Sequence, residues 1–175
     1  RNLKFFENSG LRSDGLDFSS EGLKLAKKLI KKKSTNLILD ALPNMVKIKK
    51  DNYVAVIDCF TSFALTKEDF KIYLTRVNEV LIKKGLFHCQ IFSSRSDLFV
   101  NYKPAKKINK YSLKRIKRKN APFSKDPYLW SFPSKFFLYN ILKSKKFQKI
   151  NIETHSRTYR NSKEYLEYFV ISCQK

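Results

Sequence analysis

Short apolar stretches alternate with amphipathic, helix-like patterns along this chain of 175 residues. The stretch at 53–57 is unbroken, as a strand that is buried on both faces should be. This alternation predicts an α/β fold with a largely parallel sheet. The predicted strands lie at 15–18, 36–39, 53–57 and 86–92.

Three helical patterns accompany these strands, one before the first strand, one after it and one between the last two. The first ends near Asn8, and the second can be capped by Ser19 or Ser20. The third begins at Thr66, and Lys83-Lys84-Gly85 is expected to close it with cations and a C-cap glycine. The apolar stripes of the second and third helices are Leu23, Ala26, Leu29 and Ile30, and Phe70, Leu74, Val77 and Leu81.

The last quarter of the chain predicts a helix and a hairpin. Ser134 can cap a helix, and two strands follow at 149–154 and 165–173. The connection between these strands is too short for a helical crossover, so they should pair antiparallel. The stretch at 93–133 is the least regular and is expected to be a basic excursion from the fold.

Two acids stand where predicted strands end. Asp17 is followed at once by a helix, which is how Rossmann-like sheets hold the two hydroxyls of a ribose. Asp40 is placed to accept a hydrogen bond from an adenine amino group. Alternatively, Asp17 only favours the start of a helix and Asp40 is an ordinary loop acid. The glycine-rich turn of such sheets lies about 20 residues before the acid, and therefore before Arg1.

Most of the chain resembles the class I, Rossmann-like methyltransferases that depend on S-adenosylmethionine. Residues 1–29 are similar to the stretch after the glycine-rich motif, and NLILDALP at 36–43 is similar to the adenine motif. YVAVIDCFTSF at 53–63 and the closing hairpin resemble later strands of the family. The resemblance implies a mostly parallel sheet with a C-terminal antiparallel hairpin and the first strand missing. It implies one domain over 1–175, a fragment truncated after the glycine-rich motif, with a basic insertion at about 95–133.

The resemblance also implies the cofactor, S-adenosylmethionine, and the residues that bind it. Asp58 is weighed as a general base or as a polar strand end, and Cys59 as a nucleophile or an ordinary buried thiol. The chain departs from the family at Val54, at Lys83-Lys84-Gly85 and in the missing glycine-rich loop. Asp17 would bind the ribose, Phe18 the adenine ring and Asp40 and Ala41 the adenine edge, while Asp58, Cys59 and Phe60 would flank the methionine part.

The net charge of +22 is spread over the chain, which favours compositional bias over a dedicated binding surface. Two interpretations of the basic run at Lys103–Lys119 remain open: it binds nucleic-acid phosphates, or it is a solvated excursion from the fold. The aromatic cluster after the run lines a substrate pocket or packs against the sheet. Tyr128 and Trp130 are the substrate-binding candidates in this cluster, which also includes Phe123, Phe132 and Phe136.

These features predict a methyltransferase that acts on a small molecule by in-line displacement. The turn Asp58-Cys59-Phe60-Thr61 differs from the Asn/Asp-Pro-Pro-aromatic turn of amino-base methyltransferases. The alternatives are an RNA-directed methyltransferase and a non-catalytic α/β domain that binds nucleic acid. Three unpaired cysteines and the lack of a membrane span or signal peptide favour a cytoplasmic protein, and two histidines without partners at ligand spacing make a metal site unexpected.

Overall fold

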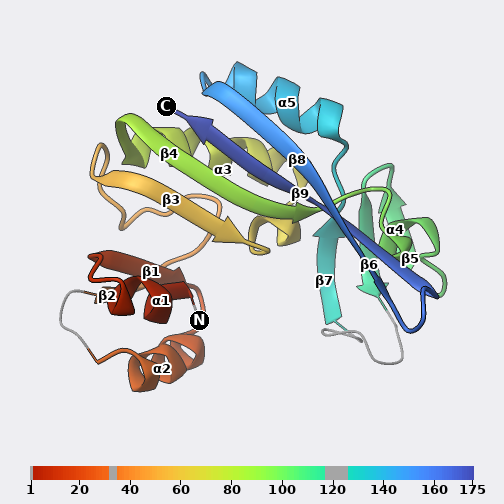
Figure 1. Ribbon diagram of the computed structural model, residues 1–175, viewed down its shortest axis with the longest axis horizontal. Coiled ribbons are helices and arrows are strands. Elements are labelled where there is room, and N and C mark those ends of the chain that lie inside the picture. Colours follow the sequence, from red (N-terminus) through yellow and green to blue (C-terminus); the bar gives the residue numbers. More distant parts are fainter. Residues whose placement is uncertain (1, 32–34, 117–125) are drawn as a thin grey trace. The chain divides into compact units, whose positions relative to one another are not determined.

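The computed structural model describes residues 2–31, 35–116 and 126–175, which form two compact units (Figure 1). The first unit is Arg1–Lys49 and the second is Lys50–Lys175. The single domain expected over 1–175 stays a prediction. No helix among the described residues is long and apolar enough to cross a membrane.

The first unit is a small α/β layer. Strands β1 (Ser13–Asp17) and β2 (Thr35–Leu39) pair in parallel, with Asp17 opposite Leu39. Helix α1 (Asn2–Asn8) precedes β1, and helix α2 (Ser20–Leu29) follows it. The hydroxyl of Ser19 accepts the Gly22 N–H at 3.1 Å, which confirms the predicted cap of α2. Gly10, which follows α1, has a φ of 74°, the left-handed conformation that commonly ends a helix.

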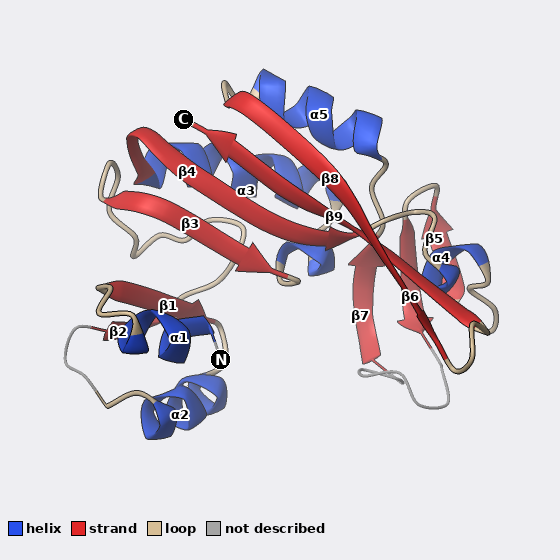
Figure 2. Cartoon of the chain, in the orientation of Figure 1, coloured by secondary structure: helices blue, strands red, loops and turns tan. Residues whose placement is uncertain are grey.

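A four-stranded mixed sheet forms the centre of the second unit, in the order β3-β4-β9-β8 (Figure 2). Strands β3 and β4 are parallel, and β9 pairs antiparallel with both β4 and β8. The predicted C-terminal hairpin is therefore confirmed. The strand bounds are Tyr53–Cys59 for β3, Leu81–Phe92 for β4, Gln148–Tyr159 for β8 and Glu164–Gln174 for β9.

The core of this unit lies against one face of the sheet. Phe87, Cys89 and Ile91 alternate with more exposed neighbours along β4 and are almost completely buried. Tyr73 of helix α3 (Lys67–Val80) contacts the ring of Phe87, and Phe147, just after helix α5 (Lys135–Ser144), contacts the same ring. Both predicted caps, Thr66 for α3 and Ser134 for α5, are confirmed.

Strand β3 is not buried on both faces, so that prediction is wrong for the described structure. Val54 is 72% exposed and Ile57 is 44% exposed. Strand β3 is the edge strand of the four-stranded sheet, and the side chains of β4 show that the unit's core covers one face. Its apolar sequence therefore does not require two covered faces in this unit.

Helix α3 ends at Val80, and the predicted continuation to Gly85 is wrong. Leu81 already begins β4, and Lys84 takes a φ of 63°. The backbone here is held by Lys175, whose carbonyl accepts the Lys84 N–H at 3.2 Å and whose N–H donates to the Gly85 carbonyl at 2.9 Å. Pairing with a distant segment thus outweighs a local helix-end signal.

The basic insertion is a folded sheet in its described part, and the expectation of an irregular excursion is wrong there. Strands β5 (Lys106–Asn109), β6 (Ser112–Ile116) and β7 (Asp126–Ser131) pair antiparallel in that order, after a short helix α4 (Asp97–Val100). The apolar side chains between the lysines supply a core of their own. This core consists of Ala105, Leu113, Ile116, Trp130 and Phe132.

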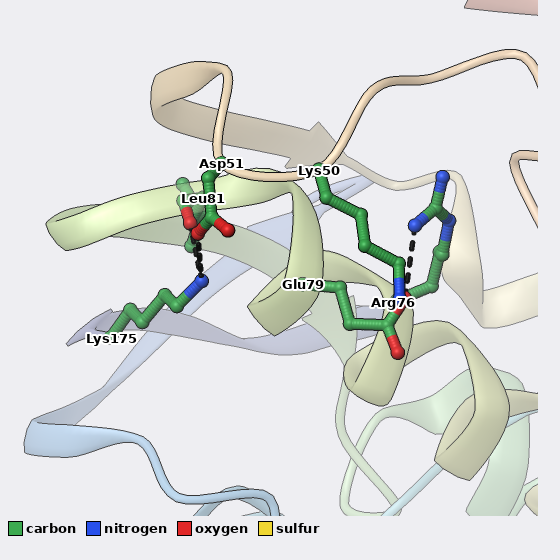
Figure 3. A network of polar contacts seen from close by, with 6 residues as sticks. All are labelled: Lys50, Asp51, Arg76, Glu79, Leu81 and Lys175. Atoms are coloured by element: carbon green, nitrogen blue, oxygen red, sulfur yellow. Dashed lines mark hydrogen bonds and ion pairs between the residues drawn. The ribbon is translucent and has the colours of Figure 1, made fainter.

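A polar network fastens the first residues of the second unit to α3 and β9 (Figure 3). Oε2 of Glu79 lies 2.9 Å from Arg76 Nη1 and 3.4 Å from Lys50 Nζ. The hydrogen bond from Arg76 is the main cause that lowers the pKa of Glu79. At the other end of the network, Lys175 Nζ donates to Asp51 Oδ1 at 2.6 Å.

Candidate functional site

Asp17 lies at the carboxyl end of β1 and is half-buried. Its Oδ1 accepts the Ser19 N–H at 2.9 Å, so the side chain is fixed by the first turn of α2. Among the described residues, Oδ2 of Asp17 has no donor. A Cβ at Gly22 would come within 2.9 Å of this oxygen, so glycine allows α2 to start this close to the carboxylate. The Ser19 N–H thus orients the carboxylate, and a contact of Asp17 with a ribose stays a prediction.

Asp40 follows β2, and the structure brings it beside Asp17. The Asp40 N–H donates to the Asp17 carbonyl at 3.2 Å, which continues the parallel pairing of the two strands. The Asp40 carboxylate accepts the N–H groups of Ala41 at 2.8 Å and Lys47 at 2.7 Å. Asp40 thus stabilises the loop after β2, as expected if it is a loop acid, which was the alternative to a contact with adenine.

Phe18 and Ala41 complete this edge of the first unit. Phe18 is 73% exposed although it is a large apolar residue, and Ala41 is also exposed. The structure therefore gathers four of the predicted cofactor residues, Asp17, Phe18, Asp40 and Ala41, at the carboxyl ends of β1 and β2.

Asp58 ends β3 in the second unit and is buried, with 4% of its surface exposed. Its Oδ1 accepts the N–H groups of Thr61 at 2.9 Å and Ser62 at 3.3 Å. Its Oδ2 accepts the hydroxyl of Tyr73 at 3.1 Å and the thiol of Cys89 at 3.7 Å. This carboxylate organises the turn after β3, which fits the structural alternative better than a general base that must reach a substrate.

The neighbours of Asp58 are affected by its charge. Burial, followed by the charge of Asp58, raises the pKa of Tyr73 well above its usual value. The same two causes raise the pKa of the Cys89 thiol. Burial and this raised pKa both disfavour a reactive thiolate at Cys89, whereas Cys59, which is half-buried on the neighbouring strand, is the more accessible of the two.

Phe60 joins an aromatic group at the end of the sheet. Its φ is 55°, an uncommon left-handed conformation for a bulky residue, and its N–H donates to the Gln90 carbonyl at 3.0 Å. Its ring lies 4.8 Å from Phe92 and 5.3 Å from Tyr168, measured between centroids. The predicted contacts of Asp58, Cys59 and Phe60 with the methionine part of a cofactor stay predictions.

The aromatic cluster after the basic run is divided between core and surface. Trp130 is 3% exposed and stacks on Phe92 at 5.4 Å, whereas Tyr128 is 62% exposed. The structure thus gives Trp130 the packing role that the sequence left open, and substrate contacts of either residue stay a prediction. Of the remaining members, Phe132 is buried, Phe136 is exposed, and Phe123 lies outside the described residues.

The described part of the basic run is solvent-exposed. Lys106, Lys107, Lys110, Lys114 and Arg115 are all exposed on β5, β6 and their connection. Lys107 Nζ lies over the rings of Phe99 at 5.1 Å and Tyr102 at 5.7 Å. The remaining members of the run, 117–119, lie outside the described residues.

A pocket of about 290 Å³ in the second unit was not predicted from the sequence. It lies between the start of α3, the β5–β6 turn and the start of α5. No sequence signal indicated it, because its walls come from segments that are far apart along the chain. The lining includes Ser62, Lys67, Phe70, Lys110, Tyr111 and Phe137. Within the described ranges, no group of three or more His, Cys, Asp or Glu side chains could hold a metal ion.

No protein-family model and no curated protein sequence matches this chain. Solved structures do resemble it. One is a 1,6-didemethyltoxoflavin-N1-methyltransferase from Burkholderia thailandensis, with 1,6-didemethyltoxoflavin and S-adenosylhomocysteine bound. The TM-score is 0.67 at 16% identity, over 100% of this chain and 66% of that one.

Two further methyltransferase structures show the same likeness. A protein from Methanosarcina mazei that depends on S-adenosylmethionine has a TM-score of 0.73 at 16% identity, over 93% of this chain and 82% of that one. Another from Archaeoglobus fulgidus has a TM-score of 0.71 at 14% identity, over 99% of this chain and 80% of that one. The predicted fold class is confirmed: this chain has the Rossmann-like fold of the S-adenosylmethionine-dependent methyltransferases.

Proposed function

We propose that this chain is a methyltransferase that uses S-adenosylmethionine. The observation that carries the proposal is the oriented carboxylate of Asp17 at the carboxyl end of β1, in a fold shared with enzymes of this kind. The relative from Burkholderia thailandensis, which was solved with S-adenosylhomocysteine, supports the same cofactor. The predicted truncation before Arg1 stays a prediction.

The residues of the first unit fit the adenosine part of this cofactor. Ser19 holds Oδ1 of Asp17, so Oδ2 remains to accept hydrogen bonds from ribose hydroxyls. The exposed ring of Phe18 offers an apolar surface to the adenine. Each oxygen of the Asp40 carboxylate has a second lone pair. Asp40 can therefore accept a hydrogen bond from the adenine amino group while it still accepts those from the N–H groups of Ala41 and Lys47.

We propose a small molecule as the methyl acceptor. The bound cofactor supplies an electrophilic methyl group, and the protein contributes position and exclusion of water. A pocket of about 290 Å³ is near the lower end of the range for small-molecule sites and supports an acceptor of modest size. Ser62 lines this pocket and belongs to the turn that Asp58 organises at the end of β3.

The test is to incubate the protein with S-adenosylmethionine carrying a tritiated methyl group, and separately with a small-molecule cell extract and with total RNA. We expect label in the small-molecule fraction and none in the RNA. Label in RNA that disappears when Lys106, Lys107, Lys110, Lys114 and Arg115 become alanine would favour an RNA-directed enzyme instead. Label in neither fraction, with no binding of S-adenosylhomocysteine, would favour the non-catalytic domain.

A further inference from the structure

The pocket of the second unit has an apolar floor and a charged rim. Phe70 and Ile91 are 5% and 1% exposed and form part of its floor. Two serine hydroxyls that line it are engaged within the protein: Ser131 Oγ donates to the Leu65 carbonyl at 2.6 Å, and Ser112 Oγ lies 3.4 Å from Ser131 Oγ. These bonds fix the walls, so the pocket is formed before a ligand arrives.

Two stacked rings with two lysines form one side of the pocket. The ring of Tyr111, in the β5–β6 turn, lies 6.1 Å from the ring of Phe137 on α5 at an interplanar angle of 25°. Lys67 Nζ lies 5.6 Å from the Phe137 centroid, and Lys110 Nζ lies 5.4 Å from the Tyr111 centroid. Three separate segments thus bring two aromatic surfaces and two ammonium groups to one place.

The charges at the rim favour an anion. Within the described parts of the chain, neither Lys67 nor Lys110 has a carboxylate within salt-bridge distance. Glu68 is the acid in the described lining, so two cations face one anion. An anionic group on a ligand would find a partner in each ammonium, whereas a cation would be repelled by both.

We propose that this pocket binds a planar aromatic molecule that carries one anionic group, such as a hydroxy- or amino-substituted aromatic carboxylate. The ligand ring packs on the parts of Tyr111 and Phe137 that line the pocket, and its carboxylate draws the ammonium groups of Lys67 and Lys110 away from these two rings into ion pairs. The volume accommodates a molecule of one or two rings.

The role of this molecule as the methyl acceptor rests on the proposed function. The acceptor oxygen or nitrogen forms the bond to the methyl carbon, the electron pair of the carbon–sulfur bond stays on sulfur, and the acceptor's proton passes to water. The positive charge of the sulfonium is thereby neutralised, and the product is a methylated aromatic carboxylate.

Binding is tested by calorimetry on the full chain without cofactor, using three probes. These are 4-hydroxybenzoate, its neutral analogue 4-hydroxybenzamide and the non-planar 4-hydroxycyclohexanecarboxylate. We expect 4-hydroxybenzoate to bind, and each of the other two to bind about tenfold more weakly, because one lacks the charge and the other the flat ring. No binding of 4-hydroxybenzoate, or equal affinity for the acid and the amide, would overturn the proposal.

Substitutions test whether 4-hydroxybenzoate binds in this pocket. The double change Lys67→Gln and Lys110→Gln should weaken 4-hydroxybenzoate about tenfold or more, whereas Lys106→Gln, an exposed lysine of the same sheet outside the pocket, should not. If the double variant is unfolded by circular dichroism, amide chemical shifts of the unaltered protein decide instead. Shifts at 109–112 on adding 4-hydroxybenzoate support the pocket, and shifts only elsewhere overturn it. Because no cofactor is present, these results stand apart from the binding of S-adenosylhomocysteine, which tests the proposed function.

Discussion

The phenolic hydroxyl of Tyr73 donates a hydrogen bond of 3.1 Å to Oδ2 of Asp58, and the two side chains are 2% and 4% exposed. A buried carboxylate depends on its donors, since an unsatisfied charge inside a protein is costly. We therefore expect Tyr73→Phe to lower the free energy of unfolding by about 1.5–3 kcal/mol, the usual range for a hydrogen bond to a charged group.

Urea unfolding followed by circular dichroism measures this change. The matched control is Tyr139→Phe, because Tyr139 is a helical tyrosine that is 46% exposed. Its loss of a hydroxyl should change stability by less than about 0.5 kcal/mol. Equal effects of the two substitutions would show that the bond to Asp58 contributes nothing particular.

The protonation of Cys173 is expected to make the free energy of unfolding depend on pH in the alkaline range. Burial raises the pKa of this thiol from 9.0 to about 12. The folded state therefore holds the proton more tightly than the unfolded state, so this contribution is complete below pH 9.0 and is lost as the pH rises toward 12. In urea unfolding at several values between pH 8 and 10.5, we expect the stability of the natural protein to fall more steeply with pH than that of Cys173→Ala. Parallel curves would contradict this coupling.

Glu79 links stability to acid pH in the opposite sense. Its pKa lies below 4.5, chiefly because Arg76 donates a hydrogen bond to it, so its contribution is present above pH 4.5 and is lost as the pH falls further. Glu79 is 38% exposed, so solvent screens the pair, and Glu79→Gln should cost at most about 1 kcal/mol at pH 7. The cost should shrink at pH 3, because protonation of Glu79 removes the ion pair in the natural protein as well. A cost that is the same at both pH values would argue against the pair.

Trp130 reports directly on the folded insertion, because it is the single tryptophan of the chain. Since it is 3% exposed among Phe63, Phe92 and Phe132, its fluorescence should be blue-shifted and resistant to quenching by acrylamide. Adding urea should shift the emission to that of free tryptophan. Emission typical of exposed tryptophan in the folded protein would instead support the irregular excursion that the sequence predicts at 93–133.

Local signals predicted the element starts. Ser19, Thr66 and Ser134 cap the helices that were expected there, because a side chain that accepts an N–H two or three residues later acts within its own turn. Asp17 and Asp40 were found in the same way, because parallel strands end at one edge of a sheet. These features depend on neighbours in sequence, so they can be read without the fold.

Features that depend on distant partners were not predictable. Lys84 and Gly85, the expected end of α3, are instead held by backbone bonds to Lys175, which is far along the chain. The candidate pocket likewise unites Lys67, Lys110 and Phe137 from three separate segments. Lys110 belongs to the basic run, but no local signal joins it to the other two residues. The basic composition of the insertion indicated an exposed, charged segment, and it did not indicate that the apolar residues between the lysines form a core.

The carboxylate of Asp17 is the centre of this account, and calorimetry with S-adenosylhomocysteine and its 2′,3′-dideoxy analogue tests it most directly. We predict that the natural protein binds S-adenosylhomocysteine about tenfold or more tightly than the analogue, because a charged acceptor loses its ribose donors in the analogue. Asp17→Asn should remove most of this preference, and Asp14→Asn on the same strand should keep it. Equal affinity of the natural protein for the two ligands, or no binding of either, would contradict the proposed cofactor site.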